Sequence, residues 1–272
     1  HCISSAASDV YKRQEYTDPY AFANVTKPED YKAFLAGEEK NAAHIFGAHE
    51  RTVNGVKGVL FNVWAPKALS VSVVGEFNKY DGRVHLMERI EDTGVFELFI
   101  PGLAAGCGYM YEIKRQGKGT TRKLDPVSRQ ISSVPITASV VSDENMPDSY
   151  AWNDGLWMIK RKKEAGKKKP VTVYEVSLTD WLKEKSADEL VDFVKQEGYT
   201  HVCFLPVAEY LNEEMNGYST LGYFAVTHRT GGSDAFKKLV DDCHNAGIGV
   251  IIDWNGAYSV SYTHLRAHET RS

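Results

Sequence analysis

The last third of the chain alternates short apolar runs with amphipathic segments, and this alternation restricts the fold most. Residues 171–178 (VTVYEVSL), 200–207 (THVCFLPV) and 248–254 (IGVIIDW) are compact apolar runs, as in parallel strands buried on both faces. Between them, residues 186–198 and 233–247 carry apolar side chains at helical spacing. A strand–helix–strand–helix–strand order predicts right-handed crossovers and a parallel sheet.

Both predicted helices have an identifiable inward face. Ser186 and Glu189 form a capping-box pattern at the start of the first helix, and Gly198 marks its end. The predicted inward residues are Leu190, Phe193 and Val194 in the first helix and Phe236, Leu239, Val240 and Cys243 in the second.

Periodicity alone leaves two architectures open, an open Rossmann-type sheet and a closed (β/α)₈ barrel. The first strand is followed by SLTDW and not by a glycine-rich phosphate loop, which argues against nucleotide binding. The second strand is followed by a long segment, residues 208–232, which we interpret as a loop. Barrel enzymes build their active sites from loops at this position.

Residues 48–142 show a different pattern, with alternating polar and apolar side chains and frequent turn residues. This pattern predicts an all-β sandwich. The predicted strands are residues 58–66, 70–78, 94–102, 108–119 and 128–134. Residues 27–47 have helical spacing and predict a short lead-in helix. Trp64 alternates with Phe61 and Val63, so we expect a core position for it.

A lysine-rich segment separates these two parts of the chain. Residues 149–170 pass from a tryptophan-bearing stretch to a run of lysines that ends in proline. Such charge runs are typical of solvated connectors. We expect Trp152 and Trp157 to pin this connector onto its neighbours.

Composition excludes several classes of partner. The formal net charge is −4 and the isoelectric point is near 6.2, which gives no basic footprint for nucleic acid or an anionic membrane. No apolar run approaches the length of a membrane span, and residues 1–14 lack the apolar core of a secretory signal. Cys203 and Cys243 lie in apolar segments and predict buried free thiols, as in the reducing cytoplasm.

Specific motifs carry a resemblance to a known family. WAP (64–66) followed by VSVVGEFNKYDG (71–82) resembles the N-terminal carbohydrate-binding module, family 48 type, of glycogen branching enzymes. VYEVSLTDW, THVCFLPVAEY and the stretch from GYSTLGYFAV to GVIIDW resemble the start of their catalytic domain, which belongs to the alpha-amylase family (glycoside hydrolase family 13). The resemblance covers roughly residues 40–257. It implies an immunoglobulin-like sandwich followed by the first three strands of a truncated (β/α)₈ TIM barrel.

Pattern and resemblance together divide the chain. The expected parts are a lead-in at 15–47, the module at 48–142, a linker at 143–170 and a partial barrel at 171–258. Residues 1–14 and 259–272 resemble translated sequencing-adaptor sequence, and we interpret them as artefacts. His264 and His268 have helical metal-ligand spacing, but they fall in such a segment and predict no metal site.

The resemblance assigns four substrate-binding residues. It implies that Tyr218 stacks on the sugar next to the scissile bond and that Asp253 contacts the same sugar. Glu209 aligns with an acid of the family on the loop after the second strand. Tyr80 takes the position of an aromatic that stacks on glucose in related modules. From the residues alone, Tyr218 and Tyr80 also fit packed loop or turn aromatics, and Asp253 fits a solvated strand end.

The resemblance also implies what this chain lacks. The family works by a retaining mechanism, in which a carboxylate nucleophile and a carboxylic acid flank the glycosidic bond. These carboxylates lie on strands four, five and seven, so we expect no catalytic residue here, no cofactor and no metal. The expected partner is an alpha-glucan such as glycogen, and the expected location is the cytoplasm.

Departures from the family pattern leave alternatives open. DWNGAY (253–258) stands where the family has a motif like DWVPAH, so that Tyr258 replaces a histidine. Met110 stands where related modules often carry lysine. The chain is therefore either a truncated branching enzyme or a non-catalytic glucan-binding homologue. A debranching enzyme shares the layout, but YEVSLTDW and GYFA favour branching.

Overall fold

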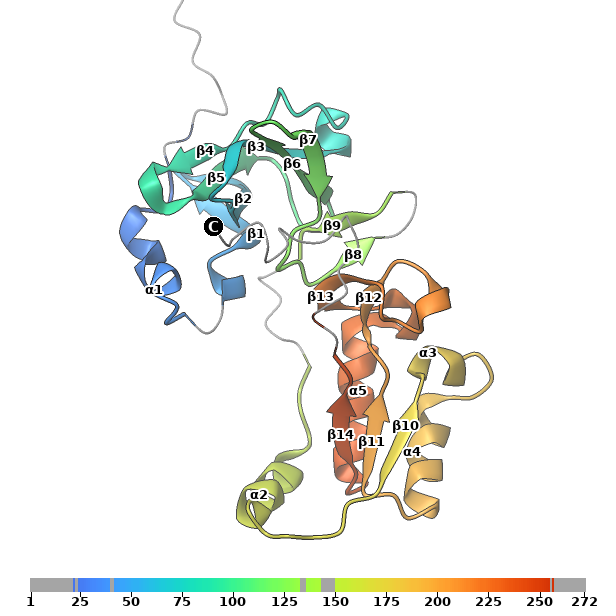
Figure 1. Cartoon of the computed structure of the whole chain (residues 1–272). Helices are drawn as coiled ribbons and strands as arrows, with labels where there is room; N and C mark the ends of the chain where they lie inside the picture. The colour runs from blue at the N-terminus through green and yellow to red at the C-terminus, as the bar shows by residue number, and fades with distance from the viewer. Residues whose placement is uncertain are drawn as a thin grey trace, which may run out of the picture.

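A computed structural model describes residues 22, 24–39, 42–132, 136–142, 150–254 and 256. Figure 1 shows a β-rich part above a smaller part in which helices flank a parallel sheet. The candidate site lies in the second part.

The β-rich part is a sandwich of two antiparallel sheets. One sheet has the order β1-β2-β5-β4, and in the other β6 pairs with β3, β7 and β9, with β8 at the edge beyond β9. The strands of the first sheet are β1 (Gly47–Val53), β2 (Val56–Trp64), β4 (Glu88–Ile90) and β5 (Val95–Pro101). Those of the second are β3 (Ala68–Gly75), β6 (Gly108–Arg115), β7 (Gly119–Lys123), β8 (Ile131–Ser132) and β9 (Ala138–Val140).

Side chains from the facing sheets fill the sandwich core. Phe61 of β2 and Tyr109 of β6 meet edge to face, with ring centroids 5.0 Å apart. Asp125 is buried among them and accepts hydrogen bonds from the hydroxyls of Tyr109 (2.6 Å) and Tyr111 (3.2 Å). Burial raises the pKa of the Asp125 carboxyl, although both tyrosine hydroxyls oppose this change.

The lead-in segment contains the predicted short helix and covers the outer face of the first sheet. It consists of the 3₁₀ turn Pro28–Tyr31, α1 (Lys32–Leu35) and the 3₁₀ turn Ala42–His44. Trp64 lies half-buried on this outer face and packs edge-on against Phe34, and not in the main core with Phe61 and Val63.

The second part contains the parallel sheet that the sequence predicts. Its order is β10-β11-β14, and both neighbouring pairs are parallel. The strands are β10 (Val173–Val176), β11 (His201–Phe204) and β14 (Gly249–Ile252). A short helix, α3 (Leu178–Trp181), follows β10, in a segment to which the sequence analysis assigned no helix.

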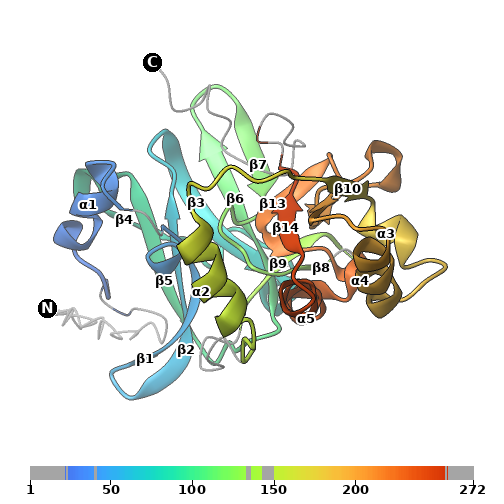
Figure 2. The same cartoon turned by 90° about the horizontal axis from the view of Figure 1, so that it is seen from below.

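Two helices cover one face of this sheet. In α4 (Ala187–Gln196), the Ser186 hydroxyl accepts a hydrogen bond from the Glu189 amide and the Glu189 carboxylate accepts one from the Ser186 amide, which is the predicted capping box. Both predicted stripes, in α4 and in α5 (Gly232–Asn245), pack onto the sheet in one cluster with Val202 and Phe204. Figure 2 shows α4 and α5 on the same side of the sheet.

The opposite face of the sheet is open to solvent. Val173 and Ile251 are 44% and 39% exposed on it, Glu175 is exposed between them and Cys203 is half-buried. The prediction of free thiols is confirmed for Cys203 and Cys243, but only Cys243 is fully buried.

The connector contains a helix that the sequence analysis missed. α2 (Gly155–Glu164) carries much of the predicted charge run and is exposed along most of its length. Trp157 stacks on His244 of α5, with ring centroids 5.0 Å apart, so it pins the connector as predicted. Trp152 is 46% exposed and contacts Tyr150, whose hydroxyl donates to Asp241 of α5.

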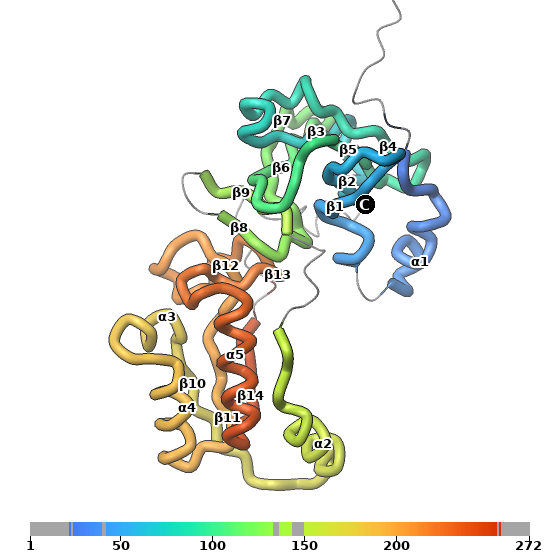
Figure 3. The backbone as a smooth tube through the Cα atoms, turned by 180° about the vertical axis from the view of Figure 1, so that it is seen from behind, coloured from blue at the N-terminus to red at the C-terminus, as the bar shows by residue number. Residues whose placement is uncertain are grey.

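The segment predicted as a loop at 208–232 is instead built around a β-hairpin. β12 (Ala208–Tyr210) pairs with β13 (Thr220–Val226), and two register shifts interrupt the pairing. Figures 1 and 3 place this hairpin between the parallel sheet and strands β8 and β9 of the sandwich.

A buried cluster joins the hairpin to the sandwich, and we call it the joining cluster. Leu221 and Ala225 of β13 are each 1% exposed. Their partners from the sandwich are Val74, Met110, Leu124, Ile131 and Ala138. A Cβ atom on Gly222 would overlap the Ile131 side chain, so glycine permits this close approach.

Among the residues that the structure describes, none of the helices combines the length and the apolar character needed to cross a membrane.

Candidate functional site

The carboxyl ends of the three parallel strands meet at one edge of the sheet. Ser177 follows β10, Leu205 follows β11 and Asp253 follows β14. The hairpin and the turn after it lie at the same edge (Figure 1). Because parallel strands present these ends together, residues far apart in sequence converge here.

Tyr218 and Asp253, both predicted site residues, are in direct contact. Tyr218 follows the 3₁₀ turn Glu213–Met215, and its amide donates to the Met215 carbonyl at 2.8 Å. Its hydroxyl donates a hydrogen bond to Asp253 Oδ2. The Asp253 amide donates to the Phe204 carbonyl at 2.8 Å, which fixes the backbone at the end of β14. The sequence thus identified a pair that the fold brings together from positions 35 residues apart.

The hydrogen bond to Asp253 also sets the electrostatics of the pair. It is the largest cause that raises the pKa of Tyr218 to about 12, and burial and the negative charges of Asp253 and Glu175 act in the same direction. The tyrosine therefore stays a hydrogen-bond donor through the physiological pH range, and the half-buried carboxylate keeps a fixed partner.

An aromatic groove that the sequence analysis did not identify adjoins Asp253. It has a volume of about 340 Å³. Its lining includes Tyr223, Phe224, Ile252, Asp253 and Trp254. Phe224 and Trp254 are 58% and 63% exposed, and the rings of Tyr223 and Trp254 lie 5.4 Å apart. The sequence did contain a signal for this groove, namely the aromatic residues of the motifs GYFA (222–225) and DW (253–254). No binding role was assigned to them from the sequence.

Glu209 has a different environment from the other predicted site residues. It is 1% exposed, and its carboxylate accepts hydrogen bonds from Arg229 Nη1 (2.7 Å), the His228 amide (2.9 Å) and the Thr227 hydroxyl (3.1 Å). It also accepts from the Tyr210 amide at 3.1 Å. These bonds tie β12 to the turn that follows β13, so Glu209 organises the segment that carries Tyr218.

Tyr80 lies on the sandwich, at the margin of the joining cluster. It is half-buried, adopts a left-handed backbone conformation (φ 59°) and packs against the joining cluster. The guanidinium of Arg122 lies 5.7 Å from its ring centroid and donates to its carbonyl at 2.9 Å. Met110 is buried in the joining cluster, which accounts for an apolar residue at this position.

Across the described ranges, no three His, Cys, Asp or Glu side chains are grouped so as to hold a metal ion. His264 and His268 lie outside the described residues, as do Tyr258 and Cys2.

Comparison with known proteins supports the predicted resemblance. Residues 45–128 match the family model for carbohydrate-binding module 48 (isoamylase N-terminal domain). This range contains most strands of the sandwich and Tyr80. The sandwich therefore includes a module of this type.

Nearly the whole chain is similar to curated branching enzymes. It is 42% identical over 253 residues to 1,4-alpha-glucan branching enzyme GlgB of Methylococcus capsulatus, covering 89% of this chain and 34% of that protein. It is 41% identical over 254 residues to the enzyme of the same name from Nitrosococcus oceani, covering 90% and 33%. The chain thus spans about a third of the length of these relatives.

A solved structure has a similar fold. A Salmonella typhimurium protein, described as a candidate alpha amylase, aligns with 81% of this chain and 35% of its own length. The TM-score is 0.57 and the identity is 24%, so this likeness concerns the arrangement of the backbone alone.

Proposed function

We propose that this chain is the glucan-binding part of a 1,4-alpha-glucan branching enzyme. The parent enzyme would transfer alpha-1,4-glucan chains to 6-hydroxyl groups. The observation that carries the proposal is the Tyr218–Asp253 pair beside an aromatic groove, in a chain with strong similarity to such enzymes. We further propose that the enzyme acts in the cytoplasm and requires no cofactor or metal.

We propose that β10, β11 and β14 are the first three strands of a (β/α)₈ barrel. The open face of the sheet supports this reading, because the inner face of a complete barrel is filled by side chains from all eight strands. The proposed boundaries are 48–142 for the module, 143–170 for the linker and 171–258 for the barrel part.

The site has the two chemical elements that a pyranose requires. Exposed rings such as Trp254 and Phe224 offer flat apolar surfaces on which the apolar face of a sugar can stack. The Asp253 carboxylate offers an acceptor for sugar hydroxyls, and charged acceptors form the stronger hydrogen bonds. Tyr218 holds that carboxylate in place and presents its own ring beside it. We assign Glu209 a positioning role through the segment that it holds, and Tyr80 a peripheral contact on the module.

In the parent enzyme, these residues would bind and orient the sugar next to the cleaved bond. The family's retaining chemistry requires a carboxylate nucleophile and an acid. We assign neither group to a residue of this chain, so we expect the 272-residue chain to form no new 1,6-linkages in a branch-linkage assay.

Glycogen binding by the full chain tests the proposal. We expect co-sedimentation with glycogen but not with cellulose, because the two glucans differ in linkage geometry. Asp253→Asn and Trp254→Ala should each reduce the retained fraction severalfold. Lys118→Ala, on the exposed β6–β7 turn, is a matched control and should behave like the unaltered chain. Equal retention of all variants, or of both polysaccharides, would refute the assignment of this site.

One sequence observation favours a second candidate function. DWNGAY in place of a DWVPAH-like motif removes a histidine that binds the same sugar in the family. A homologue that binds glucan without catalysis would tolerate this loss. Tyr258→His should raise the affinity for maltotetraose if the Tyr218–Asp253 site still binds the sugar next to the cleaved bond. An unchanged affinity would indicate that this site no longer binds that sugar.

A further inference from the structure

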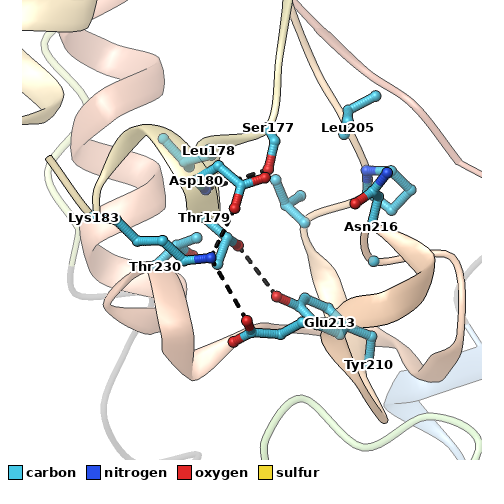
Figure 4. Close-up of a pocket in the computed structure, with 13 residues that line it drawn as sticks. Ser177, Leu178, Thr179, Asp180, Lys183, Leu205, Tyr210, Glu213, Asn216 and Thr230 are labelled. Atoms are coloured by element: carbon cyan, nitrogen blue, oxygen red, sulfur yellow. Dashed lines mark hydrogen bonds and ion pairs between the residues drawn. The ribbon is translucent and has the colours of Figure 1, made fainter. Parts of the chain in front are cut away.

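A second cavity lies at the same edge of the sheet, on the other side of the hairpin turn from the Tyr218–Asp253 pair. Its volume is about 160 Å³. Three separate segments line it: Ser177 to Lys183 around α3, Leu205 to Val207 after β11, and the hairpin with its turn. Figure 4 shows polar side chains from α3 and from the hairpin facing one another across the opening.

The ionised groups that line this cavity are held in ion pairs. Lys183 Nζ lies 2.8 Å from Asp180 Oδ1 and 3.6 Å from Glu213 Oε2, so one ammonium bridges two carboxylates from opposite walls (Figure 4). Glu213 also lies 3.8 Å from Arg229 Nε, at the back of the hairpin. Arg229 is already paired with Glu209 at 2.7 Å, so the two carboxylates and one ammonium of the lining leave a slightly negative local charge, which offers no attraction for a phosphate or another anion.

Uncharged hydrogen-bonding groups form the rest of the polar wall. The Tyr210 hydroxyl and the Thr179 hydroxyl are 3.4 Å apart, which is a long and weak hydrogen bond (Figure 4). Asn216 contributes an amide from the opposite side. Leu205, Pro206 and Val207 supply an apolar floor. A mixture of hydroxyls, an amide and an apolar surface suits a neutral polyhydroxy ligand.

The wall between this cavity and the Tyr218–Asp253 pair is one tight turn. Asn216 and Gly217 both have left-handed backbones, with φ of 46° and 86°. A Cβ atom on Gly217 would lie 2.7 Å from the Pro206 carbonyl oxygen, so only glycine allows the turn to approach the end of β11 this closely. Asn216 and Gly217 line the cavity and the next residue, Tyr218, reaches Asp253, so a ligand crossing the turn would touch both sites.

We propose that this cavity is a second subsite for one neutral hexose unit, and that it holds a glucan segment which continues past the Tyr218–Asp253 pair. The neutral, hydroxyl-binding character follows from the lining alone. That the hexose belongs to an alpha-glucan rests on the proposed function. Thr179, Tyr210 and Asn216 are the side chains that would bind its hydroxyls.

Tyrosine-resolved binding of maltotetraose to the full chain tests this subsite. With 3-fluorotyrosine incorporated, ¹⁹F signals of Tyr210, Tyr218 and Tyr80 can be assigned by single Tyr→Phe variants. We expect maltotetraose to shift the Tyr210 signal in a saturable manner, and inorganic phosphate to leave it unchanged.

Two variants remove cavity groups with little change in shape. Thr179→Val deletes a hydroxyl, and Asn216→Gly deletes an amide while keeping a residue that tolerates positive φ. Together they should weaken maltotetraose binding at Tyr210 about tenfold, since each variant removes one hydrogen bond to the ligand. Thr120→Val, on exposed β7, is the matched control and should have no effect.

The outcomes separate the subsite from the proposed function. Shifts at Tyr218 or Tyr80 with a silent Tyr210 would reject the subsite and leave the proposed function standing. Silence at all three signals would reject both. A Tyr210 shift caused equally by phosphate, or unaltered in the double variant, would reject the neutral hexose assignment.

Discussion

Replacing Glu209 by glutamine should loosen the hairpin at the candidate site while leaving the sandwich intact. The carboxylate is enclosed and accepts hydrogen bonds from two backbone amides, the Thr227 hydroxyl and the Arg229 guanidinium. His228 Nδ1 also lies 2.9 Å from it and donates or accepts according to its tautomer. Glutamine has the same shape but replaces one acceptor oxygen with a donor. In either orientation a backbone N–H then faces an NH₂ group, and Arg229 loses its closest counter-charge.

The size of the effect follows from these contacts. Removing one partner of a buried ion pair costs about 3–5 kcal/mol. Arg229 keeps some compensation, because it also contacts the Tyr210 carbonyl at 3.3 Å and stacks 4.3 Å from the Tyr210 ring. We therefore expect a loss near the lower bound, about 3 kcal/mol in the local opening free energy.

Hydrogen exchange at two backbone amides measures this loss. The Leu211 amide donates to Ser219 and the Thr227 amide donates to Val207, so both report the opening of the hairpin. An effect of about 3 kcal/mol predicts exchange about a hundredfold faster at these amides. Amides of β2 in the sandwich serve as an internal reference and should be unchanged.

Glu213→Gln is the matched control, because it removes the same charge from the same partner at a surface position. Glu213 is 61% exposed and lies 3.8 Å from Arg229, and such exposed pairs contribute about 0–1 kcal/mol. Hairpin exchange that stays within threefold of the unaltered chain in Glu209→Gln, or that accelerates equally in both variants, would refute the reasoning.

Three further predictions concern the separate parts of the molecule. Residues 48–142 alone should fold and bind glycogen weakly, and Tyr80→Ala should lower the co-sedimented fraction; equal retention would exclude Tyr80. Residues 171–258 alone should aggregate or be molten, because Leu221 loses its cover and one sheet face is open; a monomer with cooperative thermal unfolding would contradict this. Burial raises the pKa of Asp125, so its ionised form destabilises the native state at neutral pH. Relative to Asp125→Asn, the unaltered chain should gain unfolding free energy as pH falls from about 7 to about 4 in urea titrations; a constant difference would count against it.

Local sequence signals were sufficient to predict the elements that are stabilised by contacts between residues close in sequence. The Ser186–Glu189 capping box and the stripe through Leu190 and Val194 predicted α4 closely. Both signals depend only on residues three or four positions apart in the sequence. α2 was missed for the opposite reason. Its residues favour helices, but it buries no side chain fully, and its lysines were read as a solvated connector.

The β12–β13 hairpin could not be predicted from its own residues. β12 has three residues and irregular pairing, and Gly222 interrupts β13. The hairpin is stabilised by contacts with Ile131 and its neighbours, which lie far earlier in the chain and carry no local signal.

The candidate site was predicted in its polar residues and not in its apolar ones. Tyr218 and Asp253 stood out because the motifs around them are specific, whereas Trp254 and Phe224 look like ordinary strand residues. Their exposure is a property of the tertiary structure, which periodicity does not encode.

The joining cluster has a consequence for how such proteins can be recombined. In a chimera, residues 48–142 would be exchanged for the corresponding module of a homologue. Leu221 and Ala225 would then pack against a surface that evolved to contact a different hairpin. The unit that must be exchanged together is therefore the sandwich with the β12–β13 hairpin, although the connector, β10, α3, α4 and β11 lie between them in the chain. A Cβ atom at position 222 would overlap the Ile131 side chain, so substitutions at Ile131 and Gly222 are coupled, and changes in the sandwich constrain the segment that carries Tyr218.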